Sequence, residues 1–306
     1  MCILKLYRCP NLEKETGKPT YVMNESTPRT HMTSNLNRSL KGQVADYWND
    51  NPCESFASTE LPGERAFYQQ VERFRYTNQP YMEKLVGFNR FENKRILEVG
   101  CGLGTDLRQF ALGGADVVGL DMSSNSVALA QKGFAVFGIE GRFINADSER
   151  LPFDDSVFDV VYSFGVLHHT PDTQSAIDEC WRVLKPGGQF IIMLYNRRSW
   201  HVLVEPYLLL IKRWLSRRAL PSDATDQSES IRRYDGDDNP LGKAYSPSEV
   251  RNMLRKFADI RTTTRQSRFA GQSPIVKSYI RLLEMTGITR KWGFWIIAHA
   301  TRPEIR

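Results

Sequence analysis

The stretch that decides the fold runs from Arg95 to Asp106 and reads R-I-L-E-V-G-C-G-L-G-T-D. Its apolar residues between Ile96 and Val99 are typical of a short strand that is buried on both faces. Three glycines at alternate positions follow directly: Gly100, Gly102 and Gly104. Glycine lets a backbone turn tightly and approach a ligand closely. Residues 105–112 can then form a helix whose N-terminal N–H groups face that ligand.

The spacing of the glycines separates this turn from the dinucleotide-binding fingerprint. That fingerprint places a glycine three residues after its second one, whereas here, counted from Gly102, the position is held by Thr105. Instead, the acidic residue Glu98 stands two residues before the first glycine. A glycine-rich turn after a strand serves many nucleotide ligands, so the turn alone predicts a ligand site without naming the ligand.

Composition places the chain among ordinary globular proteins. Its 306 residues could form one large domain or two small ones, and no stretch is apolar for long enough to span a bilayer. The net charge of +6 permits a polyanionic partner without implying one. The first ten residues contain too short an apolar run for a secretory signal peptide, so we expect a reducing, cytoplasmic setting.

The cysteines are scattered and form no C-x-x-C pair. There are five, Cys2, Cys9, Cys53, Cys101 and Cys180, an odd number. This pattern argues against a disulfide framework and against a structural zinc site, and we expect no metal site.

The region before the glycine turn divides into two parts. Residues 1–41 contain several prolines among polar residues and predict a poorly ordered tail. Residues 42–94 predict a helical N-terminal cap, with two helices between Glu64 and Phe91 that are separated near Pro80.

Strands and helices alternate strictly after the turn, which is the pattern of a parallel sheet covered by helices. Further strands are expected at 115–120, 142–146, 158–163, 189–195, 259–264 and 294–300, with helices from Ser123 or Ser124 to Lys132 and over 173–184. A turn is expected at Lys185–Gly188. A capping box at Ser246 and Glu249 predicts a helix to Phe257. The alternation breaks over 196–244, which we interpret as an insertion that covers a substrate.

Several motifs together resemble one family. The run Glu98-x-Gly100-x-Gly102-x-Gly104 is similar to motif I of the class I S-adenosylmethionine-dependent methyltransferases. The segments L-P-F-D-D-S-V-F-D-V-V-Y-S-F-G-V-L-H-H-T-P-D at 151–172 and E-C-W-R-V-L-K-P-G-G at 179–188 resemble the subgroup that includes the quinone C-methyltransferases, the methyltransferase type 11 domain. The resemblance is strong over 95–197 and looser after Ala244.

The resemblance implies a doubly wound, mostly parallel seven-stranded α/β sheet of Rossmann-like form over 95–306, with S-adenosylmethionine as the cofactor. Acids at strand ends would contact it: Asp121 the ribose hydroxyls and Asp147 the adenine amino group, while Glu98 and the glycine turn surround the methionine part. The positions implied to bind the cofactor are Glu98, Gly100, Gly102, Gly104, Asp121, Met122, Asp147, Ser148 and Ser163. An Asp at a strand end is also a common turn or helix cap, which is the simpler alternative for Asp121 and Asp147.

Two histidines follow the fourth expected strand, where the methyl acceptor should approach. Imidazole titrates near neutrality, so His168 or His169 could act as a general base toward an acceptor hydroxyl or amine. The alternative is that one caps the loop and the other packs under the cofactor.

The acceptor is expected to be a small, partly apolar metabolite, methylated on oxygen, nitrogen or carbon. No Asn/Asp-Pro-Pro-aromatic motif, which amino-methylating nucleic-acid enzymes of the superfamily carry, follows the fourth strand. Five aromatic residues could line an acceptor pocket or simply pack in the core: Tyr47, Trp48, Tyr195, Tyr207 and Trp214. The basic run 212–218 leaves a nucleic-acid (RNA) methyltransferase as an alternative, and 201–218 could touch a membrane surface. A third possibility is an inactive cofactor-binding module.

Overall fold

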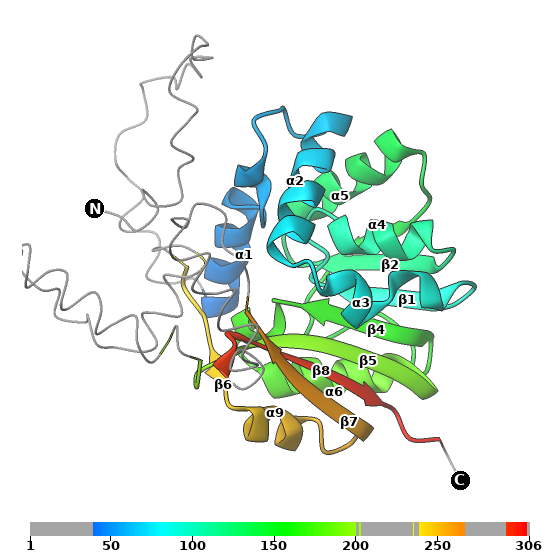
Figure 1. Cartoon of the computed structure of the whole chain (residues 1–306), viewed down its shortest axis with the longest axis vertical. Helices are drawn as coiled ribbons and strands as arrows, with labels where there is room; N and C mark the ends of the chain where they lie inside the picture. The colour runs from blue at the N-terminus through cyan, green and yellow to red at the C-terminus, as the bar shows by residue number, and fades with distance from the viewer. Residues whose placement is uncertain (1–38, 200–201, 203–234, 236–238, 267–291, 305–306) are drawn as a thin grey trace, which may run out of the picture.

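The computed structural model describes residues 39–199, 202, 235, 239–266 and 292–304, and its centre is one twisted sheet (Figure 1). The strands are β1 (Arg95–Val99), β2 (Asp116–Asp121), β3 (Arg142–Asn145), β4 (Phe158–Phe164), β5 (Leu184–Asn196), β6 (Ala244–Tyr245), β7 (Ala258–Arg265) and β8 (Trp295–Thr301). They follow the order β3-β2-β1-β4-β5-β8-β7, and the short β6 pairs with the end of β5.

Most neighbouring strands are parallel, and only the pairs that involve β8 are antiparallel. The order reverses between β1 and β4, because β2 and β3 extend the sheet on one side of β1 and the later strands extend it on the other. Ligands of such sheets bind beyond the carboxyl ends of the strands at this switch point. The expected doubly wound, mostly parallel α/β fold is confirmed.

Helices cover both faces of the sheet (Figure 1). The helices α4 (Thr105–Leu112) and α5 (Ser124–Phe137) pack their buried residues against one face, together with α3 (Met82–Val86). The helices α6 (Thr173–Val183) and α9 (Pro247–Met253) pack against the other. Most strand residues are therefore buried on both sides, which explains the continuous apolar runs in the sequence.

The N-terminal cap lies before β1 and consists of α1 (Leu40–Asp50), α2 (Arg65–Asn78) and α3, with short 3-10 turns at Ser55–Ala57 and Phe88–Phe91. The predicted pair of helices separated near Pro80 corresponds to α2 and α3. The first helix begins at Leu40, inside the stretch expected as a tail. The rest of that tail, residues 1–38, lies outside the described residues.

Two local expectations need correction. The turn expected at Lys185–Gly188 belongs to β5, where the pairing with β4 shifts register between Phe158 and Val160 and Gly187 has a φ of 76°. The capping box of Ser246 and Glu249 is present, but α9 ends at Met253 rather than at Phe257.

Much of the expected insertion 196–244, including the basic run 212–218 and the aromatic residues Tyr207 and Trp214, lies outside the described residues. Among the residues that the structure describes, no helix is long and apolar enough to cross a membrane.

Candidate active site

The glycine turn after β1 needs glycine at each of its three positions. The φ angles of Gly100, Gly102 and Gly104 are 77°, 51° and 70°, in the left-handed region that favours glycine. At Gly100 there is also no room, because an added Cβ would lie 2.3 Å from a methyl group of Val166. The turn therefore places its backbone directly against the loop that follows β4.

Asp121 at the end of β2 holds this turn in position. Its Oδ2 accepts a hydrogen bond from the backbone N of Gly102 at 2.9 Å, and its Oδ1 accepts one from the backbone N of Ser123 at 2.9 Å. Burial raises the pKa of the Asp121 carboxyl, while the amides of Ser123 and Gly102 oppose that shift. The carboxylate lines a pocket and keeps acceptor capacity for a ligand hydroxyl.

The pocket lies at the carboxyl ends of β1, β2 and β4. Seven of the eleven residues singled out from the sequence line it: Glu98, Gly100, Gly102, Asp121, Met122, Ser148 and His169. The N-terminal cap forms the opposite wall with Val44, Trp48, Cys53, Glu54 and Arg75. Between the strand ends and the cap, the pocket is lined largely by apolar residues, which include Leu103, Phe164 and Val166. The site thus combines a polar turn with an apolar chamber.

Glu98 offers an unusual buried acid in this pocket. Its side chain is buried, and among the described residues its Oε2 has no hydrogen-bond partner. Burial raises the pKa of Glu98 well above its usual range, Asp106 adds to the rise, and Arg75 opposes it. A cationic ligand group at Oε2 would satisfy an atom that is otherwise costly to bury.

A buried polar cluster around Asp106, near the start of α4, joins the cap to the turn. The carboxylate of Asp106 accepts hydrogen bonds from Nε and Nη2 of Arg75 and from the hydroxyls of Tyr76 and Tyr162. Burial alone would raise the pKa of Asp106, but Arg75 and these donors hold it below its usual range. Arg75 also pairs with Glu54 at 3.2 Å.

The sequence did not single out this cluster. Only the fold brings Arg75 against α4. A basic residue within a largely apolar helical stripe was the only signal in the sequence.

Four of the residues singled out from the sequence do not line the pocket. Gly104 caps α4, where an added Cβ would contact Phe134 and Ala130, and Ser163 donates its hydroxyl to the carbonyl of Val99 at 3.0 Å. Asp147 pairs with Lys41 at 2.6 Å and accepts a hydrogen bond from the backbone N of Glu149. The fourth, His168, is fully buried beside the pocket.

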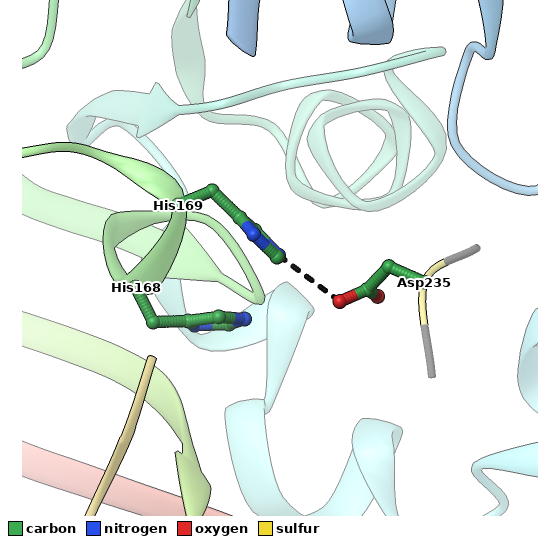
Figure 2. Close-up of side chains that lie close together, drawn as sticks. All are labelled: His168, His169 and Asp235. Atoms are coloured by element: carbon green, nitrogen blue, oxygen red, sulfur yellow. Dashed lines mark ion pairs between the residues drawn. The ribbon is translucent and has the colours of Figure 1, made fainter. Parts of the chain in front are cut away.

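The two histidines occupy a 3-10 turn after β4 and face Asp235 (Figure 2). The Nδ1 of His169 lies 2.7 Å from the carbonyl oxygen of Leu241, and since a carbonyl only accepts, Nδ1 carries a proton. The Nε2 of His169 lies 3.5 Å from Oδ2 of Asp235. The Tyr195 hydroxyl donates to Oδ1 of Asp235 at 2.7 Å.

His168 differs from its neighbour. Its ring packs against Tyr195, with centroids 3.8 Å apart, and neither of its ring nitrogens has a hydrogen-bond partner among the described residues. Burial lowers the pKa of His168 well below its usual range, and His169 and Lys243 lower it further. Of the two expected candidate bases, only His169 reaches the pocket.

A Rossmann-like α/β domain with a glycine turn and strand-end acids at its switch point is the architecture of class I methyltransferases. The family whose description reads "Methyltransferase domain" matches residues 97–192. In agreement with the resemblance seen in the sequence, residues 97–192 are similar to a methyltransferase domain.

Curated relatives match over the same region. A sterol 4-C-methyltransferase of Caenorhabditis elegans is 38% identical over 103 residues, which are 33% of this chain and 31% of the relative. A ubiquinone biosynthesis O-methyltransferase of Pseudomonas putida (strain W619) is 37% identical over 119 residues, 39% of this chain and 49% of the relative. The chain thus matches half or less of the length of these two relatives.

A solved structure agrees at the level of the fold. The magnesium protoporphyrin IX methyltransferase from Synechocystis PCC 6803 is similar with a TM-score of 0.52 and 17% identity, over 86% of this chain and 100% of that chain. At this identity the likeness concerns the arrangement of strands and helices alone.

Proposed function

We propose that the chain is an S-adenosylmethionine-dependent methyltransferase that acts on a small, partly apolar metabolite. The observation that carries this proposal is the pocket at the switch point, where the glycine turn and Asp121 face the unpartnered Oε2 of Glu98. These groups offer backbone N–H donors and two carboxylates to a ligand that carries hydroxyls and an ammonium group.

Each group has a proposed role in holding the donor. Asp121 would accept hydrogen bonds from the ribose hydroxyls, and Glu98 would accept one from the ammonium of the methionine part. Met122 and Ser148, which line the pocket beside them, would contact the adenine. Asp147 can reach the adenine amino group only if its pairing with Lys41 opens.

When bound, S-adenosylmethionine supplies a methyl group that is already activated by its sulfonium. In such a transfer an acceptor atom would supply the electron pair of the new bond to carbon, the carbon–sulfur pair would leave with sulfur, and a hydroxyl or amine acceptor would also lose a proton. The chain mainly has to hold the acceptor close and in line, an effect worth roughly 7 to 11 kcal/mol in favourable systems. The apolar residues Leu103, Phe164 and Val166 would exclude water at that point.

The nature of the acceptor rests on two supports. The pocket wall is largely apolar, and two of the relatives are a sterol 4-C-methyltransferase and a ubiquinone biosynthesis O-methyltransferase. A nucleic-acid substrate has less support, because no Asn/Asp-Pro-Pro-aromatic motif follows β4 in the sequence. Methylation on oxygen, nitrogen or carbon is open under this proposal.

The test uses the full chain and methyl-labelled S-adenosylmethionine. Incubation with a metabolite extract, followed by mass spectrometry, should reveal a small, partly apolar product that carries the label. Label found only in added RNA would favour the nucleic-acid alternative. If the chain binds S-adenosylmethionine but forms no labelled product, the result would favour an inactive cofactor-binding module.

Calorimetry tests the donor site separately. Asp121→Ala should weaken S-adenosylmethionine binding strongly. Asp116→Ala, a carboxylate at the other end of β2 that is exposed and lies outside the pocket, is the matched control and should bind normally. Equal affinity of the two variants would refute the site.

A further inference from the structure

We propose that His168, His169 and Asp235 form a binding site for a divalent metal ion of the class that prefers imidazole ligands, such as zinc. One ring nitrogen of each histidine and a carboxylate oxygen of Asp235 all lie within 4.8 Å of one another. The two imidazoles extend from one turn toward the side on which Asp235 lies (Figure 2). Neither the separation of these residues in the sequence nor the family resemblance indicated such a site.

The side-chain atoms that face this space are buried and lack hydrogen-bond partners. Within the described part of the chain, both ring nitrogens of His168, Nε2 of His169 and Oδ2 of Asp235 make no hydrogen bond. A buried polar group that stays unsatisfied is costly, because it has lost its hydrogen bonds to water. A cation that accepts lone pairs from both imidazoles and the carboxylate would satisfy three of these groups at once.

The contacts on the outer side of the cluster are those of metal ligands. Metal-binding histidines commonly donate their other ring N–H to a carbonyl or carboxylate, which fixes the tautomer and the ring orientation. Here Nδ1 of His169 donates to the carbonyl of Leu241, so the lone pair of a neutral ring is on Nε2, the nitrogen nearest Asp235. The second oxygen of Asp235 is held by the Tyr195 hydroxyl.

An ion pair without a metal explains less of this geometry. If His169 were doubly protonated, it would face Asp235 across 3.5 Å, which is longer than the roughly 2.7 to 2.9 Å of a charge-assisted hydrogen bond. His168 would still have two unpartnered ring nitrogens. A metal ion uses both histidines.

The ligand set and its size suit this class of ion. Two imidazoles and one carboxylate, without cysteine, match the three protein ligands of many zinc sites that keep a further position open. In tetrahedral geometry, ligand atoms at about 2.1 Å from an ion lie about 3.4 Å apart, so a pair at the limit of 4.8 Å has to approach by about 1.4 Å when the ion binds.

His169 also lines the pocket, so the open position would lie on the side of the methyl acceptor. An acceptor hydroxyl bound there would lose its proton more readily, a consequence that rests on the proposed function. Metal binding itself does not depend on that function.

The test measures metal binding to the purified full chain after removal of metals with a chelator and in the absence of methyl donor. Titration with cobalt(II), followed by visible absorption, should give one site per chain, and zinc should displace the cobalt. His169→Gln and Asp235→Asn should each weaken binding by about 100-fold or more, because even loss of an outer contact costs about 10- to 100-fold. Tyr195→Phe removes only an outer contact and should weaken metal binding by about 10- to 100-fold.

His299→Gln is the matched control, because this histidine lies on β8 and takes no part in the cluster. It should bind cobalt like the unmodified chain. Binding that survives His169→Gln and Asp235→Asn unchanged, or no stoichiometric binding by the folded unmodified chain, would overturn the proposal.

X-ray absorption at the zinc edge of the unmodified chain avoids any dependence on the folding of variants. The spectrum should show two imidazoles and oxygen around the metal. Sulfur ligands would place zinc at cysteines instead and would equally overturn the proposal.

Discussion

Asp121 and Gly102 are joined by a hydrogen bond of 2.9 Å from the glycine amide to Oδ2 of the carboxylate. This bond connects the end of β2 to the middle of the glycine turn after β1. The residue that is proposed to hold the cofactor ribose therefore also holds the backbone that is proposed to surround the methionine part. Binding and local stability are coupled at this position.

The first prediction separates these two roles. Asp121→Ala removes hydrogen bonds to the amides of Gly102 and Ser123, and hydrogen bonds to charged groups are worth about 1.5 to 3 kcal/mol each. Without cofactor, urea unfolding should show a lower free energy of unfolding, by up to about that size, because the burial that raises the pKa of Asp121 offsets part of the gain from these hydrogen bonds. Asp116→Ala, an exposed control on the same strand, should change it by no more than about 0.5 kcal/mol. Unchanged stability of Asp121→Ala would mean that its carboxylate does not support the turn.

The second prediction compares two glycines of the same turn. Gly102→Ala meets nothing closer than 3.9 Å, so its cost is that of the left-handed backbone, about 1 to 2 kcal/mol. Gly100→Ala adds a clash at 2.3 Å with Val166 and should cost about 1 to 3 kcal/mol more.

Val166→Ala provides the check on that comparison. It removes the two methyl groups at 2.3 and 2.4 Å but leaves a Cβ at 2.7 Å. In thermal or urea unfolding it should therefore rescue Gly100→Ala in part and should not rescue Gly102→Ala. Equal costs of the two glycine variants would contradict the packing at Gly100.

The third prediction concerns the buried ion pair between the cap and α4. The Asp106 side chain is 1% exposed and that of Arg75 is 12% exposed. Removal of one partner, as in Asp106→Ala, leaves a buried charge and should cost about 3 to 5 kcal/mol in chemical denaturation. The double variant Arg75→Met/Asp106→Leu should be more stable than Asp106→Ala alone.

An exposed pair gives the control for that experiment. Arg142 and Asp116 lie 3.1 Å apart with both side chains 57% exposed. Arg142→Ala should cost no more than about 1 kcal/mol. If Asp106→Ala cost as little, the pair of Arg75 and Asp106 would not be buried from water.

The fourth prediction is a pH dependence at the start of α6. The amide and hydroxyl of Ser175 hold the pKa of Asp172 below its usual range, because Asp172 caps this helix. A carboxyl with a lowered folded pKa stabilises the fold above its ordinary pKa of about 3.9, and this contribution is lost as pH falls through the folded value.

Asp172→Ala should therefore cost about 0.5 to 2 kcal/mol near neutral pH, and its difference from the unmodified chain should shrink below about pH 4. Asp172→Asn keeps a capping oxygen and should cost less near neutral pH. Urea unfolding at several pH values measures both. A cost of Asp172→Ala that is constant down to low pH would contradict the role of the charge.

Local patterns in the sequence were sufficient for the central fold. The alternation of apolar runs with helices predicted β1 to β5, and the capping box at Ser246 placed the start of α9 correctly. Element ends were less predictable. Lys185–Gly188 has the composition of a turn, but Arg302 exchanges backbone hydrogen bonds with Gly187 and Gly188, which continues the strand pairing.

The pocket also has one part that the sequence predicted and one part that it did not. Gly102 and Asp121 come directly after β1 and at the end of β2, so the spacing of the motif was sufficient to predict that they lie at the site. Its far wall and the histidine cluster depend on contacts between distant segments. Arg75 meets Asp106, and Asp235 approaches His169, only because the chain returns to the same edge of the sheet. Such contacts between distant segments produce no periodic pattern in the sequence from which they could be predicted.

The cap wall of the pocket has a consequence for how this protein can be divided or recombined. Residues 97–192, which match the family, do not include the whole pocket, because Trp48, Glu54 and Arg75 line it and precede this segment in the sequence. A hybrid made by exchanging that segment alone would inherit the donor turn from one parent and its enclosure from the other. Inheritance of substrate preference should therefore follow the cap as much as the exchanged segment, and the smallest transferable unit begins near Leu40.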